Sequence, residues 1–428
     1  MVPRLSAGSR FAPVAIAACL FSLASLVEQA NADDPTITRT MDAAESDGDV
    51  PKRGFTSWNE YEGPYFSARL GFGFLYDTAG YAQDDDSEEQ LTLIPTTDLR
   101  DFRLILKGQL KFIEGLSYTI GYMLDKANEE WTFRQTGLML DIPELYGNIF
   151  LGRTKEGFST SKIMVGYQGW TNERATANDA FIPILGDGIK WTGTIPSGEL
   201  VYNIGWFADG WSENESFNRN DTVVAARAVW LPFAQEEEEG VLHLAVQARF
   251  GDADDGFLRF RSKPEVFQAQ TFAVDTGSLA AQHTTTLGVE AYYRPGPLVF
   301  GMEYFFNQVA STETNDPFFH GGEIFVAYAL TGETKPYNAR GAYFERLSPF
   351  QSVFEGGPGA WEAVLRFSYI DLDDQDIDGG KFWRITPGMN WHMSDNVRLE
   401  FFAGYGMLDR FDREGGTVFV QTRLQLQL

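Results

Sequence analysis

The chain ends in the segment Val418-Phe-Val-Gln-Thr-Arg-Leu-Gln-Leu-Gln-Leu428, and this segment decides the fold. Successive side chains of an extended strand point to opposite sides. One face then carries the apolar side chains of Val418, Val420, Leu424, Leu426 and Leu428. The other face carries the polar side chains of Gln421, Arg423, Gln425 and Gln427. A tilted strand of about ten residues crosses the hydrocarbon core of a bilayer. The segment therefore predicts a membrane strand with one face in lipid and one in water.

The same alternation recurs along most of the chain. About sixteen segments carry it, at 65–77, 99–112, 116–125, 132–140, 147–155, 188–194, 199–207, 222–232, 241–251, 283–294, 298–308, 320–330, 360–371, 381–393, 396–408 and 417–428. These segments are longer than the strands of soluble proteins, which usually have about five or six residues. Many of their apolar faces also carry Trp, Tyr or Phe, as the girdles of membrane barrels do. An even number of such strands can close into a ring without open edges.

The connections between these segments differ in length. Short ones are Glu114-Gly115, Pro295-Gly296-Pro297 and Ser394-Asp395-Asn396. Long ones are 78–98, 156–187, 252–282 and 331–359. Short turns at one end and long loops at the other are typical of transmembrane barrels. We therefore predict an all-β fold, a transmembrane antiparallel β-barrel of about 16 strands with long extracellular loops. A soluble β-sandwich is the alternative, because its strands alternate too.

The N-terminus has the pattern of a secretory signal peptide. Arg4 and Arg10 precede a largely apolar run over 11–27, and Ala30-Asn31-Ala32 is a typical cleavage site. A lipoprotein cleavage box at 16–19 is the alternative. We predict a signal peptide at 1–32, an acidic periplasmic tail at 33–57 and a barrel domain at 58–428. This places the protein in the outer membrane of a Gram-negative-type bacterium.

Composition excludes several classes of function. Cys19 is the only cysteine, so a mature chain has no disulfide, thiolate zinc site or cysteine nucleophile. The net charge of −26 is opposite to that of a nucleic-acid-binding protein. No mature stretch approaches the roughly 18 uninterrupted apolar residues of a spanning helix. The four histidines have no local serine motif, so we predict neither an enzyme nor a cofactor.

One predicted strand carries a stripe of cations. Arg103, Lys107 and Lys111 alternate with leucines over 102–112. A charge facing lipid costs about 2–4 kcal/mol at the middle of the membrane, so these side chains must face a watery lumen. The four arginines at 366, 384, 398 and 423 are expected on the pore wall for the same reason.

A second basic stripe lies at Arg259, Arg261 and Lys263. In an extended backbone these three side chains share one face and stand about 6.5–7 Å apart. Guanidinium groups match the oxygens of phosphate, and a row of them offers an anion successive weak stations. The alternative is the solvated edge of a loop.

Asp374-x-Asp376-x-Asp378-Gly379 imitates the start of a calcium loop, but Ile385 stands where the closing glutamate should be.

Several stretches share a likeness to one known family. They are Leu99-Arg-Asp-Phe-Arg-Leu-Ile-Leu-Lys-Gly108, Leu151-Gly-Arg-Thr-Lys-Glu-Gly-Phe-Ser159, Leu258-Arg-Phe-Arg-Ser-Lys-Pro-Glu265, Ala329-Leu-Thr-Gly-Glu-Thr-Lys-Pro-Tyr337, Gly359-Ala-Trp-Glu-Ala-Val-Leu-Arg-Phe-Ser-Tyr369 and Gly388-Met-Asn-Trp391. Together they resemble the phosphate-selective porin O/P family of outer-membrane proteins. The resemblance implies a trimeric porin of sixteen strands whose third loop folds into the lumen, with the stripe at 259–263 as a basic ladder. Thr154 and Gly157 depart from the family's usual aromatic residue and proline.

The expected third loop is surrounded by Arg153, Lys155, Lys162 and Arg174, which are candidates for the constriction. We predict passive diffusion of small anions, phosphate or pyrophosphate first, through a lumen lined by Arg and Lys. The partners are then the outer-membrane bilayer, the anions and two further copies of the chain in a homotrimer. A general porin without strong anion preference is the alternative within transport. Outside it, the alternatives are a barrel enzyme and an adhesive surface protein.

Much of the acidic excess lies in loops, where charges beyond a Debye length of about 8 Å are largely screened.

Overall fold

A computed structural model describes residues 54–125, 130–208, 220–234 and 240–428. The predicted signal peptide and residues 33–53 of the predicted tail lie outside them. The last residues of that tail, Gly54–Ser57, form strand β1, which pairs with β2 (Glu60–Glu62). Strand β2 in turn pairs with the start of the first long strand, so the folded unit begins before the predicted boundary at 58.

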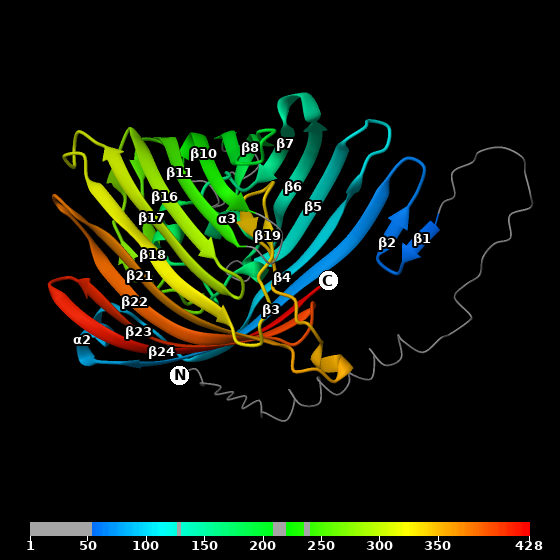
Figure 1. Cartoon of the computed structure of the whole chain (residues 1–428). Coiled ribbons are helices and arrows are strands. Elements are labelled where there is room, and N and C mark those ends of the chain that lie inside the picture. The colour runs from blue at the N-terminus through cyan, green and yellow to red at the C-terminus, as the bar shows by residue number, and fades with distance from the viewer. Residues whose placement is uncertain (1–53, 126–129, 209–219, 235–239) are drawn as a thin grey trace, which may run out of the picture. The chain divides into compact units, whose positions relative to one another are not determined.

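Sixteen long antiparallel strands in the described residues close into a barrel (Figure 1). They are β3 (Ser67–Gln83), β4 (Thr96–Gln109), β5 (Leu116–Asp125), β6 (Glu130–Ile142), β7 (Gly147–Thr154), β8 (Gly186–Thr194), β9 (Leu200–Ala208), β10 (Asn220–Ala234), β11 (Val241–Ala253), β16 (His283–Arg294), β17 (Leu298–Ala310), β18 (Phe318–Ala329), β21 (Ala360–Asp374), β22 (Ile377–His392), β23 (Val397–Arg410) and β24 (Arg413–Gln427). Each pairs with the next, and β24 returns to β3 with Thr417 opposite Gln83 and Gln427 opposite Gly73. Every predicted strand is confirmed.

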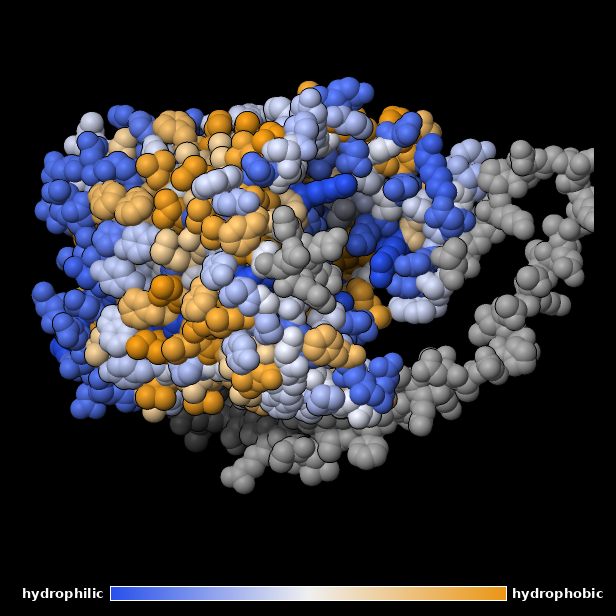
Figure 2. Space-filling model, viewed as in Figure 1, coloured by the Kyte–Doolittle hydropathy of each residue, from blue (hydrophilic) through white to orange (hydrophobic). Residues whose placement is uncertain are grey.

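The two faces of the strands differ as the alternation predicts. In β24, Val418 and Val420 are exposed, whereas Gln421, Arg423 and Gln425 are buried inside the barrel. Figure 2 shows hydrophobic side chains spread over the outer wall and hydrophilic ones gathered along its rim. This distribution suits a wall that meets lipid. None of the helices in the described ranges is long and apolar enough to cross a bilayer.

The connections fall at two ends of the barrel, here called the loop side and the turn side. Described connections on the loop side are 84–95 with α2 (Asp85–Gln90), 155–185, 254–282, 311–317, 375–376 and 411–412. Those on the turn side are 110–115, 143–146 with η1 (Pro143–Leu145), 195–199, 295–297, 330–359 and 393–396.

The grouping of 331–359 with the long loops is wrong. This connection follows β18, the twelfth strand of the described barrel, and an even number of antiparallel strands returns the chain to the turn side. It contains β19 (Tyr337–Asn338), β20 (Tyr343–Phe344) and η3 (Val353–Glu355), and we call residues 330–359 the turn-side insert. The predicted contrast in length holds for 84–95, 155–185 and 254–282, but it fails for this connection and for the two-residue loop-side connections 375–376 and 411–412.

Three inserted segments fill much of the barrel. Loop 3 (155–185) contains α3 (Thr160–Ile163), η2 (Gly166–Gln168) and α4 (Thr176–Phe181). Loop 5 (254–282) contains β12 (Phe257–Leu258), β13 (Arg261–Ser262), β14 (Val274–Asp275) and β15 (Leu279–Ala280). Phe181 of loop 3 and Phe260 of loop 5 share a buried cluster with Phe319 of the wall. Trp170 of loop 3 and Phe344 of the turn-side insert share another with Tyr292. The third loop thus folds into the lumen, as predicted.

Glycine is required where loop 3 leaves the wall. Gly157 has a φ of 83°, a backbone conformation that favours glycine. A Cβ added there would lie 2.9 Å from the Cβ of Asn203. Because proline fixes φ near −65°, the proline of the family pattern would not fit this backbone. The departure at Gly157 therefore has a steric reason.

Candidate functional site

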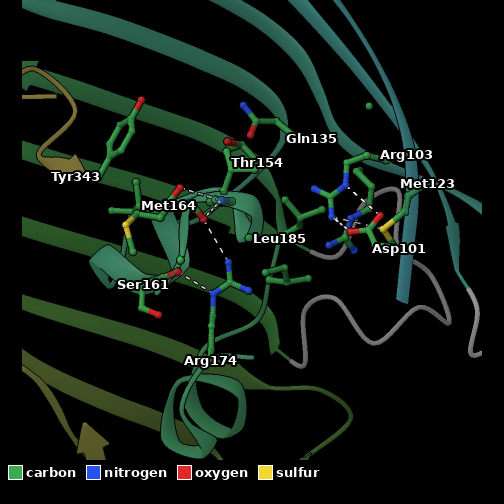
Figure 3. A pocket seen from close by; sticks show the side chains of 18 of the residues that line it. Asp101, Arg103, Met123, Gln135, Thr154, Ser161, Met164, Arg174, Leu185 and Tyr343 are labelled. Atoms are coloured by element: carbon green, nitrogen blue, oxygen red, sulfur yellow. Dashed lines mark hydrogen bonds and ion pairs between the residues drawn. The ribbon is translucent and has the colours of Figure 1, made fainter. Parts of the chain in front are cut away.

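A cavity of about 790 Å³ lies between loop 3 and the wall formed by β4 to β8. Its described lining holds nine cationic side chains, Arg100, Arg103, Lys107, Arg134, Lys155, Arg174, Lys190, Arg366 and Arg423. It holds four carboxylates, Asp101, Glu173, Asp179 and Glu323. Figure 3 shows Arg174 with Ser161 and Met164 on the loop 3 side, and Arg103 with Asp101 on the strand across the cavity. The space between loop and wall is therefore positively charged, although the whole chain is acidic.

Three of these cations meet where loop 3 begins. Lys155 donates from Nζ to the carbonyl oxygens of Ile163 at 2.8 Å and Met164 at 2.6 Å. Arg174 donates to the same Met164 oxygen at 3.2 Å, so two positive groups converge on one carbonyl. Lys190 of β8 donates to the carbonyl oxygen of Lys155 at 3.0 Å. Within the described residues no carboxylate forms an ion pair with any of the three, which leaves their charge available to a mobile anion.

Three other arginines of the cavity are already paired with carboxylates. Arg100 binds the carboxylate of Glu173 with two hydrogen bonds of 2.8 and 3.0 Å. Arg423 binds the same carboxylate at 2.6 Å and Asp77 of the wall at 2.7 Å. Arg103 is paired with Asp101. These groups are held in fixed positions, whereas the cations around Lys155 have only neutral oxygens as partners.

A family model described as phosphate-selective porin O and P matches residues 69–428. The match covers the whole barrel apart from the first residues of β3. The chain belongs to this porin family. The resemblance seen in the sequence is thereby confirmed.

Two curated proteins and three solved structures resemble this porin. An uncharacterized protein of Caulobacter vibrioides is 29% identical over 204 residues, which are 47% of this chain and 39% of that protein. Porin O of Pseudomonas aeruginosa is 25% identical over 214 residues, which are 43% of this chain and 48% of that protein. The chain thus aligns with less than half the length of either relative.

The solved structures are an anion-selective porin from Comamonas acidovorans, the trimer form of in-vitro folded OmpT of Vibrio cholerae, and Salmonella typhi OmpF in complex with daunomycin. The first is 13% identical at a TM-score of 0.50 and covers 84% of this chain and 100% of its own. OmpT is 12% identical at 0.50, covering 84% and 99%. OmpF is 11% identical at 0.51, covering 86% and 100%. At these identities the likeness shows the fold alone, which is that of an outer-membrane porin.

The structure brings four of the predicted candidates of this porin into the cavity. They are Arg103 and Lys107 of β4 and Lys155 and Arg174 of loop 3. The inward placement predicted for the stripe on β4 is thus correct for Arg103 and Lys107. Lys111 lies instead in the turn after β4, where it pairs with Glu62 of β2.

Two other candidates near loop 3 are structural ion pairs. Arg153 of β7 is buried against Asp187 of β8 at 2.8 Å. Lys162 of α3 pairs with Asp179 of α4 at 2.6 Å, so it joins two parts of loop 3. Neither residue lines the 790 Å³ cavity. Their charges are balanced by partners that no local sequence pattern reveals.

The stripe at 259–263 lies in loop 5 and outside this cavity. Arg259 pairs with Asp275 at 2.5 Å and stays half exposed. The guanidinium of Arg261 stacks over the ring of Phe272 at 4.2 Å, and Lys263 donates to the carbonyl oxygen of Phe267 at 2.7 Å. The nearest approach of this stripe to the cavity is through Phe267, which is part of the lining.

The four wall arginines point inward and hold the inserted loops. Arg366 donates to the carbonyl oxygen of Glu173 in loop 3 at 2.8 Å. Arg398 donates to the carbonyl oxygen of Gly169 in loop 3 at 2.9 Å. Arg384 donates to the carbonyl oxygen of Pro264 in loop 5 at 2.9 Å. Arg423 donates to Asn172 of loop 3. The expected inward orientation is correct, and the partners show that these arginines fasten the loops to the wall.

Sequence reasoning missed Arg100, Arg134 and Lys190. Lys190 alternates with Ile189 and could have been found from the period of its strand. Arg100 could not have been found in this way, because it lies three residues from Arg103 and strict alternation would place the two side chains on opposite faces of the strand. The pairing of β4 with β3 skips this residue, since Leu75 faces Asp101 and Tyr76 faces Leu99. Such a bulge turns an extra side chain toward the lumen.

We expect anion binding in this porin to weaken as the pH rises. Burial, with Arg174 the next cause, lowers the pKa of Lys155 well below its usual value. A bound anion favours the charged ammonium, so binding takes up a proton. Affinity is full below the lowered pKa and then falls by up to about tenfold per pH unit until the pKa of the occupied site is reached.

This pH dependence can be measured as the block of chloride current by sulfate, which does not titrate in this range. Lys155→Arg is the control, because a guanidinium keeps its charge. The dependence should disappear in that variant. An equal slope in the variant and the original chain would assign the titration to another group.

Proposed function

We propose that this outer-membrane porin lets small anions diffuse passively through its lumen, with phosphate or pyrophosphate the leading candidates. The observation that carries the proposal is the group of Lys155, Arg174 and Lys190, which faces the cavity with no carboxylate in ion-pair distance among the described residues. The name of the family and the name of the Comamonas acidovorans porin agree with an anion as the solute. A general porin without strong anion preference is the alternative.

The chemistry asks for no cofactor and no energy source. An anion entering a narrow passage loses part of its hydration, and ammonium and guanidinium groups replace that water. Carbonyl oxygens of Ile163 and Met164 share the same cations, so the anion competes with neutral acceptors and is not trapped. Weak binding of this kind allows the ion both to enter and to leave. The family model that matches the chain is that of a porin, so we propose a channel and not an enzyme.

The basic stripe of loop 5 has a secondary place in this proposal. Arg259 and Lys263 belong to loop 5, which connects strands on the loop side of the barrel, where an anion would arrive first. Their charges are engaged by Asp275 and by a carbonyl oxygen, so we assign them a weak outer station. The selective step lies deeper, at Lys155 and Arg174.

We extend the proposal to export and assembly. Residues 1–32 act as a cleaved signal peptide, and the barrel assembles as a homotrimer, as the solved OmpT form does. The acidic segments 84–89 and 371–378, the second of which includes the ends of β21 and β22, then lie on the loop side. No group of three or more His, Cys, Asp or Glu residues in the described ranges could hold a metal ion, and we propose no cation site at 374–379.

The proposal is tested by recording single channels of the full chain in planar bilayers. We expect steady conductance, a reversal potential that favours chloride over potassium in a salt gradient, and block of the chloride current by added phosphate. Cation preference would overturn the anion assignment and keep the pore. Absence of conductance would remove the pore itself.

A further inference from the structure

Glu173 of loop 3 lies where wall arginines from separate strands converge. Its carboxylate accepts two hydrogen bonds from Arg100 of β4, at 2.8 and 3.0 Å, and one from Arg423 of β24, at 2.6 Å. Its side chain is 11% exposed and lines the cavity. A bidentate contact between a carboxylate and a guanidinium has the geometry that phosphate also adopts. Glu173 therefore occupies a place that a permeating anion would otherwise take.

The carboxylate is not what fastens this part of loop 3 to the wall. Arg366 donates to the backbone oxygen of Glu173 at 2.8 Å, and Arg423 also donates to that of Asn172. Nearby, Asn390 donates to the backbone oxygen of Trp170 at 2.9 Å. These contacts use main-chain oxygens and survive a change of the side chain. The charge of Glu173 is thus separable from the path of the loop.

We propose that Glu173 is a built-in counter-anion that keeps the pair Arg100 and Arg423 from holding permeating anions. The inference rests on the proposed function, because it assumes that anions reach this cavity. With the carboxylate in place, Arg100 and Arg423 contribute little net charge, because Glu173 and Asp77 balance them. Without it, Arg100 has no carboxylate in ion-pair distance among the described residues, while Arg423 keeps Asp77, and the two guanidinium groups form a second anion site in the cavity that also holds Lys155 and Arg174. The residue would then set how tightly the pore holds an anion and, through that, how fast the anion leaves.

Burial alone would disfavour a charged carboxylate here. The guanidinium groups of Arg100 and Arg423 outweigh burial and hold the pKa of Glu173 well below its usual range. The counter-anion is therefore charged at every pH at which the protein would work.

The test compares the original full chain with Glu173→Gln and Glu323→Gln in planar bilayers, with inorganic phosphate as the probe. Both substitutions remove one negative charge from the same cavity. In the described part of the chain Glu323 forms an ion pair with Arg366, at 3.4 Å, and Arg366 keeps a second carboxylate partner in Glu265. Removal of Glu323 thus leaves no arginine without a carboxylate partner, which makes it a matched control.

We expect the phosphate concentration that halves the chloride current to fall about tenfold or more in Glu173→Gln. In Glu323→Gln it should change by less than about threefold, since a neighbouring carboxylate remains. Glu173→Asp should behave like the original chain. The double variant Arg100→Gln with Glu173→Gln should reverse most of the gain, since one guanidinium of the pair is gone. An unchanged gel shift between heated and unheated protein checks that each barrel has folded.

Equal effects in Glu173→Gln and Glu323→Gln, or no gain of phosphate block in Glu173→Gln, would overturn the counter-anion role. The failure of this role and the failure of the proposed function give different results. A cation-preferring original chain would overturn anion transport, yet a new phosphate block in Glu173→Gln would still support the role of Glu173.

Discussion

Exchanging Lys155 and Arg174 for glutamate is expected to turn the pore from anion-preferring to cation-preferring. At a pH below the lowered pKa of Lys155, the double substitution changes the local charge by four units in the lumen. Even at the dielectric constant of bulk water, one unit of charge changes the energy of a monovalent ion about 4 Å away by about 1 kcal/mol. Four units are then worth about three powers of ten in the local concentration of anions. The reversal potential in a salt gradient should change sign.

The matched control is Arg259→Glu with Arg261→Glu, which makes the same change of charge in loop 5. Both residues lie outside the cavity, and Arg259 is half exposed beside Asp275. Solvent and salt screen charges in such a position. The control should shift the reversal potential much less and leave its sign unchanged. If the loop 5 variant inverts the preference and the loop 3 variant does not, selectivity lies in the basic ladder.

Replacing Arg227 by leucine is expected to give the largest loss of stability. Arg227 of β10 has a side chain that is 0% exposed and pairs with Glu290 of β16 at 2.8 Å. It also donates to Thr160 of loop 3 at 2.7 Å and to the carbonyl oxygen of Ala342 in the turn-side insert at 3.1 Å. One side chain therefore joins the wall to segments that enter from both ends. Its loss leaves Glu290 buried without its cation, which costs about 3–5 kcal/mol.

The measurement is the temperature at which the folded barrel loses its faster migration in a detergent gel. Arg227→Leu should lower that temperature and increase current noise as loop 3 loosens. The double variant Arg227→Leu with Glu290→Leu removes both charges, and replacing a buried ion pair by apolar residues is often neutral for stability. It should recover the temperature and keep the noise. A noisy pore in neither variant would mean that the other contacts of loop 3 suffice to hold it.

Periodicity predicted the fold because the geometry of a strand is local. Whether Val420 or Gln421 faces outward depends only on its place in its own strand, so the sixteen segments and their faces could be found without any contact between them. The same reasoning placed Arg103 and Lys107 in the lumen. It failed at Arg100, because the pairing of β4 with β3 leaves one extra residue there. The side chains on either side of it no longer follow strict alternation between the two faces of the strand.

The partners of the charged residues could not be predicted in this way. Arg153 finds Asp187 and Arg423 finds Asp77 across 34 and 346 residues of sequence. Lys155 has no such carboxylate partner in the described part of the chain, although it stands two residues from Arg153. Which cation is neutralised depends on the strand that happens to lie opposite, and a single sequence does not contain that information.

The amino-acid sequence by itself determined the barrel, the orientation of its walls and the inward placement of cations such as Arg103 and Lys107. Only the tertiary structure decided that 330–359 enters from the turn side, that loop 3 carries Lys155 and Arg174 to the cavity, and that Glu173 lies on Arg100 and Arg423. The physical reason is the separation along the sequence over which each interaction acts. Alternation acts between neighbours along one strand, whereas the charge felt by a permeating ion depends on segments that meet only after the chain has closed and its loops have folded inside.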